Sequence, residues 1–277
     1  MVVEVDLAAF RAFERAGWEA AGKAARYAAG WGPITSQSVD ALLDAAGVGA
    51  GKHVLDVASG PGYVAAAAHR RGALVVGIDV AEAMVRLARD LHPELTFRQS
   101  EAEELPCAEA TFDAVVGNFL VNHLAAPETA VAEARRVLKP GGRAAFTVWD
   151  TPDRARFIGV LLDAIATVGA PPPTDLPVGP PIFRFSDNSA FSRLLTGAGL
   201  RQSEVRELQY SQRFADADEL WNCLVLGSVR LGALVLCQPE TTQQLVRQEF
   251  EQNLEPYETS DGLVLPVSVK LGVAVKA

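Results

Sequence analysis

The sequence predicts a doubly wound α/β fold, in which helices cover both faces of a mostly parallel sheet. Between residues 52 and 150, short apolar runs alternate with segments of helical composition. These runs are apolar on both faces, as are the strands of a buried parallel sheet. A glycine-rich turn directly follows the first run. With 277 residues, the chain can bury a sizeable core and forms one or two domains.

Five strands are expected in this central region, and each coincides with one apolar run. They are expected at 53–58, 73–79, 96–99, 112–117 and 143–149. Helical composition between the runs predicts three helices, at 62–71, 81–91 and 127–138. Lys139, Pro140 and two glycines follow the third helix and predict its end and a turn.

Before the central region, the apolar spacing predicts an amphipathic helix over 4–28 that Gly30, Gly32 and Pro33 break. A second helix is expected over 36–46, with Thr35 or Ser36 as its cap.

After the central region, six prolines within 170–181 predict a stiff loop. The remaining pattern predicts helices at 187–198, 216–236 and 239–254, and strands at 203–210 and 263–275. The whole is expected to be one domain with a seven-stranded sheet, an antiparallel terminal strand and a helical lid.

Composition favours a small-molecule partner. The 34 acidic and 25 basic residues give a net charge of −9, which argues against binding to nucleic-acid phosphates or an anionic membrane. Three scattered cysteines predict neither a disulfide framework nor a zinc site. We find no secretory signal and no apolar run long enough to span a membrane, so a cytoplasmic location is expected.

The strongest local signal is the strand, turn and helix over 54–65. Gly60 and Gly62 allow a sharp turn against which a ligand can lie, next to the free N–H groups of a helix N-terminus. Asp79 ends the next strand, where a carboxylate can accept both hydroxyl hydrogens of a ribose. The alternative is a tight turn without a ligand, with Asp79 capping the following helix.

The same turn satisfies the dinucleotide fingerprint through Gly60, Gly62 and Ala65, so an NAD(P)-dependent oxidoreductase is a rival hypothesis. Asp56 lies on the strand just before the turn. Its carboxylate would repel a diphosphate and attract an ammonium group, which favours a nucleoside that carries an amino acid.

Residues 52–150 resemble the core of class I S-adenosylmethionine-dependent methyltransferases, which have a Rossmann-like fold. Five motifs of this family occur in order, at 54–62, 77–80, 100–106, 112–118 and 136–142. Five ordered motifs are more specific than one glycine loop. Residues 1–51 and 151–277 resemble the family's entrance helices and its lid helices with the last strands, but only loosely.

The resemblance implies a role for individual residues. The methionine part of the cofactor would lie against Asp56, Ala58, Gly60 and Gly62, and Asp79 would hold the ribose. Adenine would contact Val80, Met84, Glu101 and the N–H of Ala102, while Asn118 would face the ammonium and Tyr27 the carboxylate. Two positions depart from the family pattern: Ala58 replaces a common glycine, and Glu101 replaces the usual aspartate.

His123 is the candidate general base, because it follows the fourth strand at the carboxyl edge of the sheet. The alternative is that it satisfies a backbone carbonyl or packs beside the cofactor. Several aromatic residues outside the core motifs either line a substrate pocket or fill the hydrophobic core: Trp18, Tyr27, Trp31, Trp149, Phe183, Phe185, Tyr210 and Trp221.

The resemblance therefore implies methyl transfer (EC 2.1.1) from S-adenosylmethionine to a small apolar acceptor, at oxygen, carbon or nitrogen. S-adenosylhomocysteine would be released, and no metal is expected because the sequence has no metal-binding motif. A methyltransferase-like protein that uses the cofactor structurally is a further alternative. The acceptor and the oligomeric state are not determined by the sequence.

Overall fold

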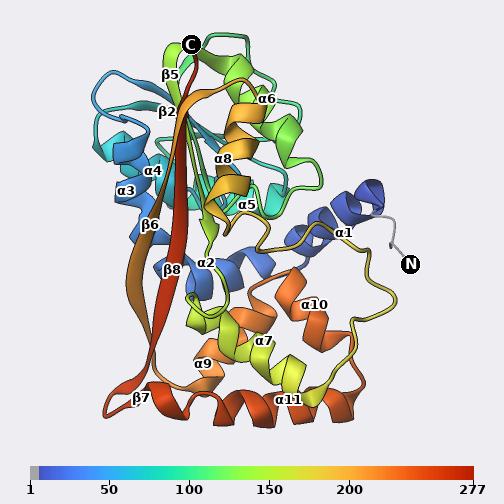
Figure 1. Cartoon of the computed structure of the whole chain (residues 1–277). Coiled ribbons are helices and arrows are strands. Elements are labelled where there is room, and N and C mark those ends of the chain that lie inside the picture. The colour runs from blue at the N-terminus through green and yellow to red at the C-terminus, as the bar shows by residue number, and fades with distance from the viewer. Residues whose placement is uncertain (1–5) are drawn as a thin grey trace.

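The computed structural model of the protein describes residues 6–277. Its centre is a sheet in the order β3-β2-β1-β4-β5-β8-β6, with a short strand, β7, paired to β8 (Figure 1). Strands β1 to β5 are parallel to one another, while β8 is antiparallel to both β5 and β6. This confirms the mostly parallel doubly wound sheet with an antiparallel C-terminal strand, although the short strand β7 makes eight strands instead of the seven expected. The strands are β1 (His53–Val57), β2 (Leu74–Asp79), β3 (Thr96–Gln99), β4 (Phe112–Asn118), β5 (Leu138–Trp149), β6 (Arg201–Phe214), β7 (Glu258–Thr259) and β8 (Gly262–Val275).

Helices cover both faces of the sheet. One apolar cluster joins α3 and α4 to β1 and β4, and a second joins α6 and α8 to the same sheet. The helices that cover the two faces are α3 (Val39–Ala45), α4 (Tyr63–Arg70), α5 (Glu82–Leu91), α6 (Pro127–Val137) and α8 (Asn188–Gly197).

A third cluster lies at the far end of the long strands β6 and β8, which extend from the sheet into a group of helices (Figure 1). This group contains α7 (Arg156–Val168), α9 (Ala217–Trp221), a π-helical turn η2 (Asn222–Leu226), α10 (Arg230–Leu236) and α11 (Glu240–Gln252), followed by the 3-10 turn η3 (Glu255–Tyr257). The N-terminal helices α1 (Leu7–Glu19) and α2 (Lys23–Thr35) lie between this group and the sheet layer (Figure 1).

The N-terminal helices differ from the sequence prediction. The break falls at Gly22, whose φ is 75°, and α2 continues through Gly30, Gly32 and Pro33 to Thr35. Neither Thr35 nor Ser36 is a side-chain cap, because α2 passes through the 3-10 turn η1 (Ser36–Ser38) into α3. The predicted start at residue 4 lies outside the described residues.

Gly30 and Gly32 serve close packing instead of ending the helix. A Cβ on Gly30 would lie 3.0 Å from the Cα of Cys223, and one on Gly32 would lie 2.9 Å from the ring of Tyr63. The glycines therefore allow α2 to approach η2 and the start of α4.

Three other elements differ. Strand β5 already pairs at Leu138, and residues 139–142 form an irregularity within it. The helix expected at 216–236 is divided into α9, η2 and α10, and α7 was not expected. Residues 170–181 form neither helix nor strand, as their prolines predict.

No single helix among residues 6–277 is long and apolar enough to cross a membrane. Among these residues, only the helix pair Ala217–Leu226 and Arg230–Leu236 is together long and apolar enough by length and composition, and the two helices are bent by 104° relative to each other.

We predict that Gly62→Ala destabilises the fold by about 2–4 kcal/mol, because left-handed strain adds to overpacking. The φ of Gly62 is 86°, and a Cβ would lie 2.7 Å from the buried ring of Phe97. Gly51→Ala is the matched control, since Gly51 has a φ of 75° with no atom within 4 Å of the added Cβ. Urea unfolding measures both changes, and equal losses would contradict the packing contribution.

Candidate functional site

The main cavity lies at the carboxyl ends of β1, β2 and β4. Strand order reverses between β1 and β4, and ligands of open α/β sheets bind at such switch points. The cavity has an empty volume of about 920 Å³, part of which opens to solvent. It is lined by ten of the twelve predicted site residues, namely Tyr27, Ala58, Gly60, Asp79, Val80, Met84, Glu101, Ala102, Asn118 and His123.

The turn after β1 forms one wall of this cavity. Ala58 and Gly60 both have left-handed backbones, with φ values of 58° and 51°. This conformation costs an alanine about 1–2 kcal/mol, which explains why glycine is the favoured residue at position 58 in the family pattern. The N–H of Gly60 donates to Oδ2 of Asp79 at 2.8 Å, so the turn is tied to the end of β2.

Asp79 presents a buried carboxylate to the cavity. Its Oδ1 accepts a hydrogen bond from the N–H of Ala81 at 2.9 Å. Burial raises the pKa of Asp79 to about 6, although the backbone hydrogen bonds from Ala81 and Gly60 act in the opposite direction.

Asp56 and Gly62 are not among the residues that line the cavity. Oδ2 of Asp56 accepts from the N–H of Ala65 at 3.0 Å, and its Oδ1 has no hydrogen-bond partner among residues 6–277. Gly62 precedes α4 and packs against Phe97. Direct contact of these two residues with a ligand stays a prediction, while their observed contacts shape the turn.

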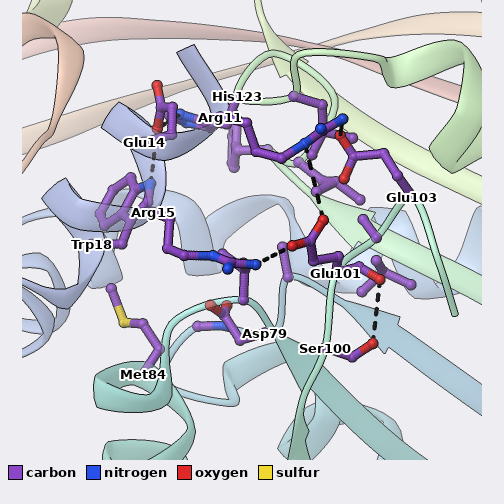
Figure 2. Close-up of a pocket in the computed structure, with 18 of the residues that line it drawn as sticks. Arg11, Glu14, Arg15, Trp18, Asp79, Met84, Ser100, Glu101, Glu103 and His123 are labelled. Carbon is purple, nitrogen blue, oxygen red and sulfur yellow. Dashed lines mark hydrogen bonds and ion pairs between the residues drawn. The ribbon is translucent and has the colours of Figure 1, made fainter. Parts of the chain in front are cut away.

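The side of the cavity predicted to receive adenine combines apolar side chains with a charged one. Val80, Met84 and Ala102 supply apolar surface. Ala102 lies in a turn, outside helices and strands. Its N–H donates to no backbone carbonyl among residues 6–277. Glu101 is already engaged, because its carboxylate forms ion pairs with Arg15 and Arg11 of α1 (Figure 2).

Helix α1 covers the cavity and supplies lining residues that the sequence analysis did not assign to the cofactor site (Figure 2). Their spacing of three, four and seven residues places them on one helical face. This mixed polar and aromatic face is the signal that could have revealed them. They are Arg11, Glu14, Arg15 and Trp18.

The side chain of Asn118 is used within the fold. Its Oδ1 accepts from the hydroxyls of Ser38 at 2.9 Å and Thr147 at 2.6 Å, and its Nδ2 donates to the carbonyl of Thr35 at 3.0 Å. Of the two predicted modes of ligand contact, these bonds favour the backbone carbonyl over the side chain.

His123 lies where the main cavity meets a second one, and it lines both. Its Nδ1 is 3.4 Å from Oε2 of Glu14, which is buried and also accepts from Nε1 of Trp18 at 2.9 Å. The ring of Trp18 meets His123 edge to face, with centroids 5.6 Å apart. The carboxyl group of Glu14 therefore faces Nδ1 of the imidazole, although Nδ1 has no hydrogen-bond partner among residues 6–277.

The second cavity has an empty volume of about 460 Å³ and mostly aromatic and aliphatic walls. Four of the eight aromatic residues considered in the sequence line it, namely Trp18, Tyr27, Trp31 and Trp149. The other four pack elsewhere: Phe185 contacts Phe191, Trp221 contacts Phe250, Tyr210 donates to the carbonyl of Ile34, and Phe183 packs on the helical cluster.

Among residues 6–277, no group of three or more His, Cys, Asp or Glu side chains is placed to hold a metal ion.

Comparison with known families places a methyltransferase domain over residues 55–146. The demethylmenaquinone methyltransferase of Beutenbergia cavernae is 36% identical over 117 residues, which are 42% of this chain and 49% of that protein. The ubiquinone biosynthesis O-methyltransferase of Alkalilimnicola ehrlichii is 34% identical over 116 residues, or 40% and 47% of the two chains. The chain thus spans about half the length of the curated relatives it matches.

Solved structures share the fold at low sequence identity. The YcgJ protein of Bacillus subtilis superposes with a TM-score of 0.58 and 18% identity, covering 87% of this chain and 98% of its own. Phosphoethanolamine N-methyltransferase 2 of Haemonchus contortus, in complex with S-adenosylhomocysteine, gives a TM-score of 0.52 at 17% identity, covering 87% and 52%.

We predict that Asp56→Asn becomes more stable relative to the wild type as the pH rises from 5 to 8. Burial raises the pKa of Asp56 from 3.8 to about 7, so folding favours the protonated carboxyl. Its stabilising contribution is complete below pH 4 and is lost as the pH rises through 7. The expected relative gain is on the order of 2–4 kcal/mol in urea unfolding.

The exposed Asp153→Asn is the control for this prediction. It should show no such pH trend. The uncharged amide of the Asp56→Asn variant carries the same hydrogen-bonding cost at both pH values, so the trend isolates the charge. A wild-type to Asp56→Asn difference that is constant between pH 5 and 8 would show that position 56 does not titrate in this range.

Proposed function

The chain belongs to the class I S-adenosylmethionine-dependent methyltransferases, and we propose that it transfers a methyl group from this cofactor to a small organic acceptor held in the second cavity. The observation that carries the proposal is the pair of adjoining cavities with His123 at their junction. One cavity has the polar groups that a nucleoside needs, and the other is mostly apolar.

The main cavity fits the cofactor. The carboxylate of Asp79 keeps lone pairs that can accept from ribose hydroxyls, and the N–H of Ala102 can donate to an adenine ring nitrogen. Val80 and Met84 offer apolar contact to adenine. The left-handed turn at Ala58 and Gly60 exposes backbone to the methionine part.

Four further assignments complete the cofactor site. The backbone carbonyl of Asn118 would accept from the methionine ammonium, and Tyr27 would meet its carboxylate. Asp56 is buried and does not line the cavity, so it would act on the ammonium electrostatically and not by direct contact. Glu101 can accept from the adenine amino group only while sharing its carboxylate with Arg11 and Arg15.

When bound, S-adenosylmethionine supplies a methyl group already activated on a sulfonium. The protein therefore has to align the acceptor with that methyl group and exclude water, and alignment alone is worth about 7–11 kcal/mol in well-oriented reactions. Helix α1 contributes to water exclusion because its Arg11, Glu14, Arg15 and Trp18 cover the cavity (Figure 2).

His123 would accept the proton that an acceptor hydroxyl, amine or acidic C–H loses. The carboxyl group of Glu14 lies 3.4 Å from Nδ1 without forming a hydrogen bond to it. This contact occupies the Nδ1 side of the ring, so we assign the role of base to Nε2. As the acceptor takes up the methyl group, Nε2 of His123 would accept the proton that the acceptor loses. A His123 that only packs beside Trp18 is the alternative.

Several features favour a flat, apolar acceptor. The second cavity is walled by Trp31, Phe119 and Trp149, and the rings of Phe119 and Trp149 stack with their centroids 3.8 Å apart. Relatives over the core domain are named for menaquinone and ubiquinone biosynthesis, which supports a ring compound as substrate. A soluble, cytoplasmic setting without nucleic-acid or membrane partners is part of the same proposal.

The first prediction from this proposal concerns cofactor binding. At pH 8, above the pKa of about 7 of the Asp56 carboxyl, S-adenosylhomocysteine should bind with an affinity that calorimetry can measure, whereas NADH should not, because a charged Asp56 beside the turn disfavours a diphosphate. Asp79→Ala should weaken S-adenosylhomocysteine binding by at least about tenfold, since two ribose hydroxyls lose their acceptor. Asp153→Ala, at an exposed position, should bind it normally.

The second prediction concerns His123. With a phenolic acceptor, His123→Ala should lower the rate of S-adenosylhomocysteine release by at least about tenfold while cofactor affinity stays unchanged. His69→Ala, an exposed histidine on α4, is the control. A His123→Ala enzyme with the wild-type rate and normal cofactor affinity would leave His123 a packing role only.

A further inference from the structure

The side-chain amide of Asn122, in the second cavity, has no hydrogen-bond partner among residues 6–277. Asn122 is only 4% exposed, and neither its amide oxygen nor its amide nitrogen has a hydrogen-bond partner among residues 6–277. Buried amides are nearly always hydrogen-bonded, because leaving them unpaired is costly. Asn122 lines the cavity, so a bound molecule could supply the missing partners.

The backbone of Asn122 is held by a partly buried cation, Arg230. Arg230 donates from Nη1 to the carbonyl of Asn122 at 3.3 Å and from Nη2 to the carbonyl of Pro180 at 2.7 Å. Its Nε lies 3.9 Å from Oε1 of Glu14, and its guanidinium lies 5.0 Å from the ring centre of Phe10. Arg230 thereby connects the loop after β4 to α1, α10 and the proline-rich loop, and it fixes residue 122 at the cavity wall.

Two other polar groups of this cavity, the hydroxyl of Ser228 and the indole N–H of Trp31, are already paired. The hydroxyl of Ser228 donates to the carbonyl of Leu224 and accepts from the N–H of Gly232 at 3.0 Å. Nε1 of Trp31 donates to the carbonyl of Cys223 at 2.7 Å. The Asn122 amide therefore offers both a free donor and a free acceptor in a cavity whose walls are mostly apolar.

We propose that Asn122 recognises a flat aromatic acceptor with oxygen substituents on two adjacent ring carbons, at least one of them a hydroxyl. The amide oxygen would accept from the hydroxyl, and the amide nitrogen would donate to the neighbouring oxygen. The stacked rings of Phe119 and Trp149 provide the apolar wall for such a ligand. That this ligand is the methyl acceptor rests on the proposed function.

His123 follows Asn122 in the chain and lines the same cavity. A ring oxygen bound by Asn122 is thus on the part of the wall that also carries the candidate base. A ring without adjacent oxygens would leave the buried amide unpaired, and sites built to bond a polar group discriminate strongly against ligands that lack it.

The test compares two isomers of one probe. Protein saturated with S-adenosylhomocysteine is titrated by calorimetry with 2,3-dihydroxynaphthalene, whose hydroxyls are adjacent, and with 2,7-dihydroxynaphthalene, whose hydroxyls are apart. We expect the 2,3 isomer to bind at least about tenfold more tightly, which corresponds to one well-made hydrogen-bond pair. Equal affinities, or no binding of the 2,3 isomer, would overturn the proposal.

The matched variant is Asn122→Leu, which keeps the size of the side chain and removes both polar atoms. It should lose the preference for the 2,3 isomer, and its melting temperature should equal or exceed that of the wild type because an unpaired buried amide is gone. Asn188→Leu, at an exposed position on α8, should keep the preference. An Asn122→Leu protein that still prefers the 2,3 isomer would overturn the proposal.

Two experimental outcomes distinguish the proposed function from the role of Asn122. A protein that does not bind S-adenosylhomocysteine would refute the proposed function and, with it, the assignment of the methyl acceptor. A protein that binds S-adenosylhomocysteine and treats the two isomers alike would refute only the role of Asn122.

Discussion

A hydrogen bond between two strand ends organises the whole site. The N–H of Gly60 donates to the carboxylate of Asp79 at 2.8 Å, and this contact holds the left-handed turn after β1 against the end of β2. Because β1 also borders β4 at the switch in strand order, the turn, the carboxylate and the loop after β4 meet at one edge. The main cavity, the helix that covers it and the second cavity all lie around that edge.

Buried polar groups around this edge are costly to the fold and useful to a ligand. Asp56 and Asp79 have raised pKa values because burial penalises their charged forms, and a ligand's ammonium or hydroxyl groups would offset that penalty. The unpaired amide of Asn122 follows the same logic in the second cavity. These groups thus lower the stability of the unliganded fold at positions where a bound molecule would raise it again, as is common at functional sites.

The sequence motifs predicted where the glycine turn and Asp79 lie in the fold. The turn after β1 and Asp79 lie where the pattern placed them, since parallel strands that follow one another in the chain bring their carboxyl ends to one edge. The helix boundaries were less predictable. Gly30 and Gly32 read as helix breakers, but they permit close contact of α2 with Cys223 and Tyr63, and only the packed structure contains those neighbours. Glu101 likewise meets two arginines of α1 that no local pattern connects to it.

The sequence by itself therefore determined the fold class, the family of the core and the residues of the glycine turn, because each depends on short-range patterns. Tertiary structure decided what surrounds them. Arg230 meets the carbonyl of Asn122 across 108 residues, and His123 meets Glu14 of the first helix. Such contacts arise from the packing of separate helices onto one sheet edge. The spacing of residues along the chain does not predict which side chains will meet there. For that reason the second cavity and its unpaired amide became visible only in the folded protein.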